Sequence, residues 1–338
     1  MTHPLVTIIT PTFNHEKYIS NCIKSVLAQK YTDWEMIIID DHSSDNTLEV
    51  INSLAKGDDR FLIIRHSKNY GIKGLAETYG EAFSIASGEL IAILEGDDFW
   101  SRHKLKTQVQ VFRDANVILS YTDYDEVEHN SIRIASRKYR VSKDSLKSNI
   151  QQNFSFFSKL NNFASNTVMI RKKTLEEIGG FRKTTLPLID YPTFLELSLK
   201  GNFYRVPETL GFWRRHNHST FYNNRAGITQ MSADYFKSFC MKHEKYIGRN
   251  NINIPAMLRN IEHSVIKHRL KAPYAEARYQ LLFGDNKKAR KKFISILKSN
   301  STPFICRIGG YIGLIFSFVP SKYYINFNRF STQFLSYY

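Results

Sequence analysis

The first hundred residues alternate between short apolar runs and longer segments whose apolar residues recur every three or four positions. Short β-branched runs predict strands, and apolar positions at i, i+3 and i+4 predict amphipathic helices. The predicted strands are residues 5–10, 34–40, 61–65 and 90–94. The predicted helices between them are residues 15–29, 45–54 and 75–86. Strands separated by helices form βαβ units, so we expect an α/β protein with a mostly parallel sheet.

Beyond residue 100 the same pattern continues more loosely. The further predicted elements are a helix at 101–112, strands at 117–121 and 164–171, and helices at 173–179 and 190–200. Residues 125–160 are polar with alternating charge, and we expect an irregular insertion there that carries acceptor selectivity. Near residue 225 the composition changes, and the remaining chain is expected to be helical, including a hairpin of helices 273–284 and 285–297. We therefore expect a catalytic domain at 1–225 and a basic helical region at 226–338.

Polar residues gather directly after the predicted strands, at 12–16, 40–45, 69–74 and 95–98. In parallel sheets, ligands bind beyond the carboxyl ends of the strands. Glu95, Asp97 and Asp98 offer hard oxygen ligands there, suited to a divalent cation that also binds phosphates. The alternative is structural: Asp97 or Asp98 caps the helix that begins near Ser101.

A nucleotide-sugar ligand would require several of these groups. The loop 11–16 offers hydrogen-bonding groups to a base and ribose, and Asp40 can accept from a uracil N–H or a ribose hydroxyl. The chain has neither a Gly-x-Gly-x-x-Gly sequence after its first strand nor a P-loop, which argues against both phosphate-binding motifs. Neutralisation of a diphosphate by a metal ion is the remaining route.

Three segments, Val6–Asn14, Ile37–Thr47 and Leu94–Trp100, occur in the order and spacing of a known family. Over roughly residues 4–220 the chain resembles the family 2 glycosyltransferases. The resemblance implies a GT-A nucleotide-diphospho-sugar transferase fold, followed here by an α-helical C-terminal region. It also implies metal-dependent, inverting transfer from a nucleotide-diphosphate sugar, expected to be a UDP-sugar, to a carbohydrate or lipid-linked glycan. The expected pathway is surface polysaccharide or O-antigen synthesis.

The resemblance also assigns roles to particular residues. Asp190 is the implied catalytic base, although Ile189 replaces the Glu of the family's Glu-Asp pair; an N-cap role for Asp190 is the alternative. His216 corresponds to the family's later metal or diphosphate His, with Arg214 or Arg215 available to phosphate; a solvent-exposed His is the alternative. The implied ligands of a Mn²⁺ or Mg²⁺ ion are Glu95, Asp97 and His216. The implied nucleotide-sugar-binding residues are Pro11, Thr12, Phe13, Asn14, Glu16, Asp40, Lys73 and Asp97.

Two other functions stay open at this stage. A nucleotidyltransferase shares a parallel sheet and metal-binding carboxylates, but usually has a Gly-rich basic loop where this chain has Thr12–Glu16. A catalytically inactive GT-A scaffold would explain why Glu95 and Ile189 depart from the family pattern.

The net charge of +16 is unevenly distributed along the chain. Residues 1–100 hold 8 Lys/Arg and 15 Asp/Glu, whereas residues 237–338 hold 18 and 4. We expect the basic region to contact an anionic membrane rather than nucleic acid, since no zinc finger, RNP-like motif or basic heptad pattern is present. Solvated basic helices without a partner are the alternative. The apolar segment 304–319 falls short of the about 18–20 residues of a spanning helix, so it lies in a membrane interface or packs on the protein itself.

Three widely spaced cysteines form no disulfide framework or zinc motif, and the N-terminus does not resemble a secretory signal. We therefore expect a cytoplasmic protein, peripheral on the inner face of the cell membrane.

Overall fold

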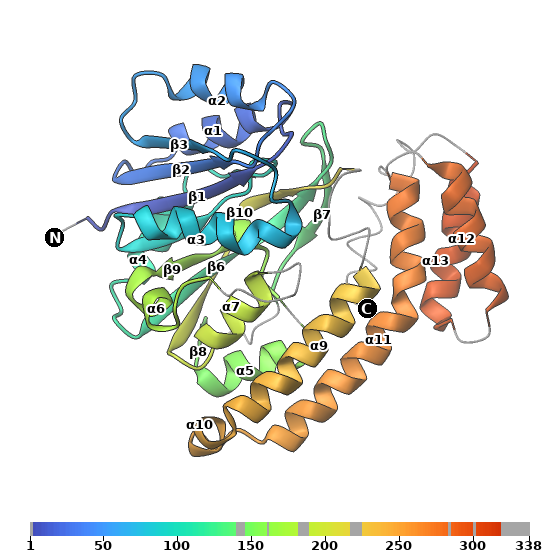
Figure 1. Ribbon diagram of the computed structural model, residues 1–338. Helices are drawn as coiled ribbons and strands as arrows, with labels where there is room; N and C mark the ends of the chain where they lie inside the picture. The colour runs from blue at the N-terminus through green and yellow to red at the C-terminus, as the bar shows by residue number, and fades with distance from the viewer. Residues whose placement is uncertain are drawn as a thin grey trace.

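The fold is built around one mixed sheet, seen in the computed structural model of the protein (Figure 1). The structure describes residues 3–139, 146–160, 162–181, 189–216, 225–282, 285–299 and 302–318. Within these residues, ten strands form a sheet in the order β3-β2-β1-β4-β9-β6-β10-β5, with β7 paired to β6 and β8 to β10. The strands are β1 (Val6–Thr12), β2 (Trp34–Asp40), β3 (Phe61–Arg65), β4 (Leu90–Ile93), β5 (Phe99–Trp100), β6 (Val117–Val127), β7 (Arg133–Arg137), β8 (Lys147–Ser148), β9 (Met169–Arg171) and β10 (Asn202–Arg214).

Helices cover the sheet and follow it in the chain. Those between or beside the strands are α1 (Ile19–Leu27), α2 (Thr47–Ala55), α3 (Leu75–Ile85), α4 (Lys104–Val111), α5 (Ile150–Ser158), α6 (Lys172–Glu177) and α7 (Asp190–Leu197). Those after β10 are α9 (Arg225–Lys242), α10 (Glu244–Arg249), α11 (Ile254–Leu282), α12 (Asn286–Lys298) and α13 (Phe304–Phe316). Two 3₁₀ turns are η1 (Ile72–Gly74) and η2 (Ser165–Thr167). No helix in these described ranges is both long enough and apolar enough to cross a membrane.

The predicted α/β class is confirmed. Every element predicted before residue 95 is present with slightly shifted bounds, and β1, β2, β3 and β4 pair in parallel, as βαβ units require. β6 and β10 are also parallel, whereas β9 runs antiparallel between β4 and β6.

Both faces of the sheet are buried. Because side chains alternate along a strand, Met36 and Ile38 of β2 pack into one hydrophobic cluster and Ile37 and Ile39 into another. The first cluster includes residues of α1, α2 and α4, and the second includes residues of α3, α5 and α7. This two-sided burial explains why the strands are apolar almost throughout.

The expected irregular insertion at 125–160 is wrong for its described residues. β6 continues to Val127, β7 pairs with it, and α5 begins with a capping box between Asn149 and Gln152. The charged residues of β6 are buried in ion pairs: Arg205 lies 2.7 Å from Asp123, and Arg215 lies 2.8 Å from Glu126. A run of charged residues therefore does not indicate a loop in this segment.

Three predicted boundaries also change. The helix after the acidic cluster begins at Lys104 with His103 as its N-cap, so neither Asp97 nor Asp98 caps it. The strand expected at 164–171 is a 3₁₀ turn followed by the short β9. The helix expected to begin at Pro273 begins at Ile254 and contains that proline.

The C-terminal region is helical, as predicted, but its helices belong to two packing groups. Phe236 and Phe239 of α9, with Ile261 of α11, join the hydrophobic cluster on the sheet. The end of α11 forms a separate cluster with α12, against which α13 packs; these helices stand together to one side of the sheet (Figure 1). The division near residue 225 stays a prediction, and the main core continues across it.

We predict that Phe236→Ala destabilises the whole sheet by about 3–5 kcal/mol, because a fully buried aromatic ring in the shared cluster is removed. Urea unfolding followed by tryptophan fluorescence measures this, since Trp34, Trp100 and Trp213 all lie in strands. Met241→Ala on the same helix is the control, because Met241 is exposed. An unchanged fluorescence midpoint for Phe236→Ala would show that α9 folds apart from the sheet.

Candidate active site

The loop after β1 is fixed by the loop after β2. The backbone N–H of Asn14 donates to Ser43 Oγ at 2.9 Å, and that of His15 donates to Thr47 Oγ1 at 2.8 Å. Asn14 adopts a left-handed φ of 53°, a conformation that asparagine tolerates better than most residues. These bonds hold the predicted binding loop 11–16 at the carboxyl edge of the sheet, where Phe13 is exposed.

Asp40 and Asp41, at the end of β2, are both engaged within the protein. Asp40 is fully buried and accepts from the backbone N–H and the hydroxyl of Ser43, with Arg65 Nε at 3.5 Å. Asp41 accepts from His66 Nδ1 at 2.7 Å and from the backbone N–H of Gly71 at 2.8 Å. The first carboxylate therefore shapes the loop after β2, and the second ties the loop after β3 to it.

His66 is held between two carboxylates, Asp41 and Glu81. Its Nε2 lies 3.0 Å from Glu81 Oε2. Burial alone lowers the pKa of His66, but its hydrogen bonds to the two carboxylates outweigh burial and raise that pKa. Lys73, the predicted binding residue on η1, is exposed beyond this cluster.

His15, Asp97 and His216 form a candidate metal centre. Each offers one ligand atom, and these atoms all lie within 4.8 Å of one another. His216 Nε2 lies 2.8 Å from Asp97 Oδ2, and His15 Nδ1 lies 3.0 Å from Thr12 Oγ1. Two imidazoles and a carboxylate are a donor set for a first-row transition ion such as Mn²⁺, and they fit Mg²⁺ less well because Mg²⁺ prefers oxygen ligands.

The protonation states of this cluster suit a cation. Burial raises the pKa of Asp97, but the neighbouring His15 and His216 outweigh burial and lower that pKa to about 2. Burial lowers the pKa of His15, which favours the neutral imidazole that binds metals. Asp97 and His15 therefore have the charge states that a divalent ion requires of its ligands.

Gly96 is required by how closely the loops after β1 and β4 approach. A Cβ atom at this position would lie 2.5 Å from Thr12 Oγ1 and 2.9 Å from His15 Nδ1. Only glycine lets His15 and Asp97 share one site, since β1 and β4 are neighbours in the sheet.

The structure does not bring Glu95, a predicted metal ligand, into this group. Its Oε1 accepts from the hydroxyl of Tyr79 at 3.0 Å. Burial raises the pKa of Glu95 to about 7, and the negative charges of Asp97 and Asp190 add to this. Glu95 is thus bonded to Tyr79 of α3 and lies within electrostatic reach of Asp190.

The arginines expected to contact phosphate are engaged elsewhere, which corrects that expectation. Arg214 is buried, and its Nε donates to the carbonyl oxygen of Asp97 at 2.7 Å. Its backbone N–H donates to Asp98 Oδ1 at 2.8 Å. Arg215 donates to Glu126 at 2.8 Å and lies over the Trp213 ring. Arg214 and Asp98 therefore join the end of β10 to the acidic loop.

Asp190, the predicted base, begins α7 and is half-buried. Its Oδ2 accepts from Asn162 Nδ2 at 2.7 Å and its Oδ1 from the backbone N–H of Tyr191 at 2.8 Å. The N-cap of α7 is Ile189, so the N-cap alternative for Asp190 is wrong. Burial raises the pKa of Asp190, while these two hydrogen bonds lower it in part.

Sequence patterns missed several residues that support the site. His216 stacks on Tyr18 with ring centroids 5.1 Å apart, and its carbonyl oxygen accepts from the hydroxyl of Tyr279 on α11 at 2.5 Å. His15 and Asn162 were missed as well. The adjacency of β1 and β4 is the signal that could have identified His15. Residues 217–220 of the predicted His motif lie outside the described residues.

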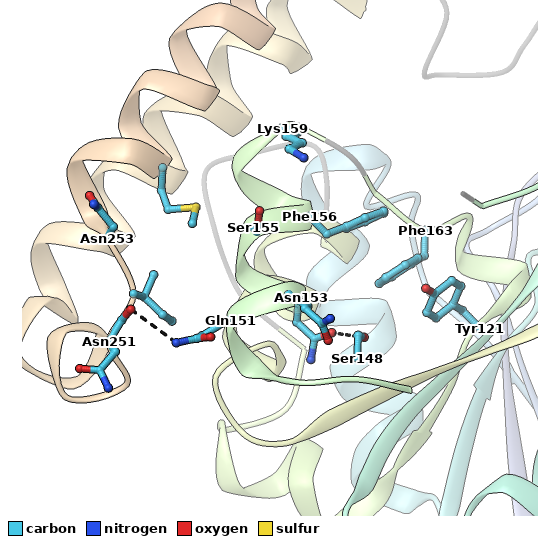
Figure 2. A pocket seen from close by; sticks show the side chains of 13 residues that line it. Tyr121, Ser148, Gln151, Asn153, Ser155, Phe156, Lys159, Phe163, Asn251 and Asn253 are labelled. Atoms are coloured by element: carbon cyan, nitrogen blue, oxygen red, sulfur yellow. Dashed lines mark hydrogen bonds between the residues drawn. The ribbon is translucent and has the colours of Figure 1, made fainter. Parts of the chain in front are cut away.

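A separate cavity of about 570 Å³ lies between α5 and the chain around residues 251–253 (Figure 2). Gln151 and Asn153 line it, but Gln151 Nε2 donates to the Asn250 carbonyl at 3.1 Å and Asn153 bonds Ser148. These polar groups stabilise the junction between the sheet and the C-terminal helices. The lining includes neither Asp97 nor Asp190, so the cavity is not part of the candidate active site.

Comparison with known sequences decides the family. Residues 7–179 match the sequence profile described as "Glycosyl transferase family 2". This chain belongs to glycosyl transferase family 2. The predicted family is thereby confirmed, and the relatives described next are named as glycosyltransferases, the predicted class of enzyme.

Two curated members of the family illustrate the likeness. The putative teichuronic acid biosynthesis glycosyltransferase TuaG of Bacillus subtilis is 36% identical over 121 residues, which are 36% of this chain and 47% of TuaG. WfgD of Escherichia coli, named a UDP-Glc:alpha-D-GlcNAc-diphosphoundecaprenol beta-1,3-glucosyltransferase, is 39% identical over 128 residues, 38% of this chain and 49% of WfgD. The chain thus spans about half the length of these relatives.

Solved structures confirm the fold. TarS 1-349 of S. aureus, in complex with UDP-GlcNAc, superposes with a TM-score of 0.53 at 17% identity and covers 85% of this chain and 87% of its own. The mannosyltransferase PcManGT of Pyrobaculum calidifontis, in complex with GDP-Man and Mn²⁺, superposes with a TM-score of 0.57 at 16% identity. This superposition covers 97% of the present chain and 85% of PcManGT. At such identities the likeness extends to the fold alone, and the predicted GT-A class is correct.

We predict that Gly96→Ala weakens Mn²⁺ binding at least about ten-fold, because the added methyl group forces Thr12 and His15 away from the Asp97 loop. Isothermal titration calorimetry with Mn²⁺ measures this. Gly80→Ala is the matched control, since a Cβ there meets no atom within 4 Å. Equal affinities in both variants would contradict the crowding at Gly96.

Proposed function

We propose that the chain transfers one sugar, with inversion, from a nucleoside-diphosphate sugar to a carbohydrate or lipid-linked acceptor hydroxyl. The observation that carries this proposal is the grouping of His15, Asp97 and His216 at the carboxyl edge of the sheet, with Asp190 nearby. A partly buried cluster of one carboxylate and two imidazoles, without a phosphate-binding glycine loop, suits a ligand whose phosphates are neutralised by a cation.

The three clustered residues would hold the divalent ion, for which Mn²⁺ fits two imidazole ligands better than Mg²⁺ does. When bound, the ion neutralises the diphosphate, which makes it a better leaving group. The loop 11–16 would bind the nucleoside, with Phe13 exposed for contact with the base. Asp40 supports this loop through Ser43, so its proposed role includes shaping the nucleoside site. Glu95, half-buried beside Tyr79, is proposed to contact the donor sugar.

Asp190 is the proposed base. Inversion requires a single displacement, in which the acceptor hydroxyl attacks the anomeric carbon opposite the leaving diphosphate and gives its proton to a carboxylate. Asn162 and the N–H of Tyr191 hold the Asp190 carboxyl group in one orientation. Its raised pKa improves its affinity for that proton.

The relatives suggest the substrates. WfgD is named for a UDP-Glc donor and a diphosphoundecaprenol-linked acceptor, and TuaG for teichuronic acid biosynthesis. On this likeness the proposed donor is a UDP-sugar and the proposed pathway is bacterial surface glycan synthesis. The reaction would take place at the cytoplasmic face of the cell membrane, with the basic C-terminal region in contact with it.

Asp97→Asn and Asp190→Asn should each lower kcat by about 10²–10⁴-fold, the usual size of a lost acid–base or charge-stabilising group. Only Asp97→Asn should also weaken Mn²⁺-dependent UDP binding. A panel of UDP-sugars with Mn²⁺, assayed for transfer and hydrolysis, and calorimetry with UDP measure the two effects.

The control for this pair is Asp59→Asn, an exposed carboxylate in the turn before β3. UDP binding without turnover in the unmodified chain would support the scaffold alternative instead. Near-normal turnover in Asp190→Asn would show that Asp190 is not the catalytic base.

Asn162→Ala should move the acid limb of the pH–rate profile to higher pH. Asp190 acts only when ionised, so activity falls as the pH drops through its pKa. Asn162 donates to this carboxylate and so lowers its pKa, and removal of the amide raises it. The pH dependence of kcat measures the shift, with exposed Asn52→Ala as the control. If the acid limb lies at the same pH in Asn162→Ala and in the unmodified chain, the pKa of Asp190 does not determine that limb.

A further inference from the structure

The outer face of α13 is apolar along its whole length. Every described side chain from residue 304 to residue 318 that is exposed is large and apolar, and these side chains are between 44% and 76% accessible. They are Phe304, Ile308, Tyr311 and Ile315 of α13, and Phe318 two residues beyond its end. Their spacing of three and four residues puts them on one side of the helix.

The opposite face of α13 fixes this orientation. Gly309 and Gly313 lie against the rings of Tyr274 and Phe293, and a Cβ on Gly313 would lie 2.3 Å from the Phe293 ring. A rotation of α13 that buried its outer face would bring large side chains into this contact. The apolar face is therefore held outward by the packing of α13 on α11 and α12.

Basic residues lie on the helix next to α13. α12 packs directly against α13, and its Lys287, Lys291 and Lys298 are exposed. Among the described residues, none of these three lysines has an acidic side chain within ion-pair distance. Residues 285–318 contain seven Lys or Arg and one acidic residue, Asp285.

We propose that the outer face of α13 lies in the interface of an anionic lipid bilayer, with the lysines of α12 against the phosphate headgroups. An apolar helix face beside lysines matches the acyl boundary and the negative surface of such a bilayer. At 13 residues, α13 is too short to span it. A second copy of the chain is a poorer occupant, since the same positive charges would face each other.

This inference deepens the proposed function, which puts the basic C-terminal region against the membrane: it rests on that placement and names the surface that makes the contact. If transfer occurs as proposed, the surface also brings the active site to a lipid-linked acceptor. Vesicle binding is measured without donor or acceptor, so failure of one proposal is distinguishable from failure of the other.

The test is co-sedimentation of the full chain with vesicles of phosphatidylglycerol and phosphatidylcholine at equal amounts, compared with phosphatidylcholine alone. The double variant Ile308→Ser/Ile315→Ser should lower the partition coefficient at least about ten-fold through lost apolar insertion. The triple variant Lys287→Gln/Lys291→Gln/Lys298→Gln should lower it about a hundred-fold at low salt. Binding of the unmodified chain should weaken as NaCl is raised.

The matched control is Leu62→Ser/Met241→Ser, which removes two exposed apolar side chains from β3 and α9. It should bind vesicles as the unmodified chain does. Circular dichroism checks folding, and the lysine variant, altered only at exposed positions, tests the proposal if the isoleucine variant unfolds. Equal partition of all variants overturns the proposal. So does a dimer in light scattering that Ile308→Ser/Ile315→Ser converts to a monomer without a change in vesicle binding.

Discussion

The site depends on one buried contact between the end of β10 and the acidic loop after β4. Arg214 donates from its side chain to the carbonyl oxygen of Asp97 and from its backbone to the carboxylate of Asp98. His216 follows two residues later and so lies beside Asp97. Because Arg214 is almost fully buried, removal of its side chain would leave the carbonyl oxygen of Asp97 without this donor, which costs about 1–3 kcal/mol. The contact that fixes this loop for the chemistry therefore also stabilises the fold.

The elements of the first hundred residues could be predicted because their hydropathy follows from two-sided burial. Beyond residue 100, hydropathy no longer predicted every element correctly. Asp123 and Glu126 look like loop residues in the sequence, but each is neutralised by an arginine from another part of the chain. Pairing between residues 80 or more apart leaves no local pattern. At Pro273 the local signal was strong but did not determine the structure. Proline usually begins or breaks a helix, yet here it lies inside α11.

The candidate site could be predicted only in part, because it too depends on contacts between distant segments of the chain. Asp97, His216 and Asp190 were named from motifs, and the structure places the first two together and the third near Glu95. The motif could not tell which carboxylate of the Glu95–Asp98 run meets the histidines, because that depends on which side of the loop faces β1. Nor could it name His15, whose place in the cluster follows from the order of strands in the sheet and from Gly96.

The hydroxyl of Tyr279 joins the two halves of the molecule at a sensitive point. It donates to the backbone of His216 from α11, the same helix on which α12 and α13 pack. α11 is therefore hydrogen-bonded directly to the backbone of a residue in the candidate metal centre. The C-terminal helices are thus part of the setting of the candidate metal centre, and a chain that ended before Tyr279 would lack this anchor for the His216 backbone.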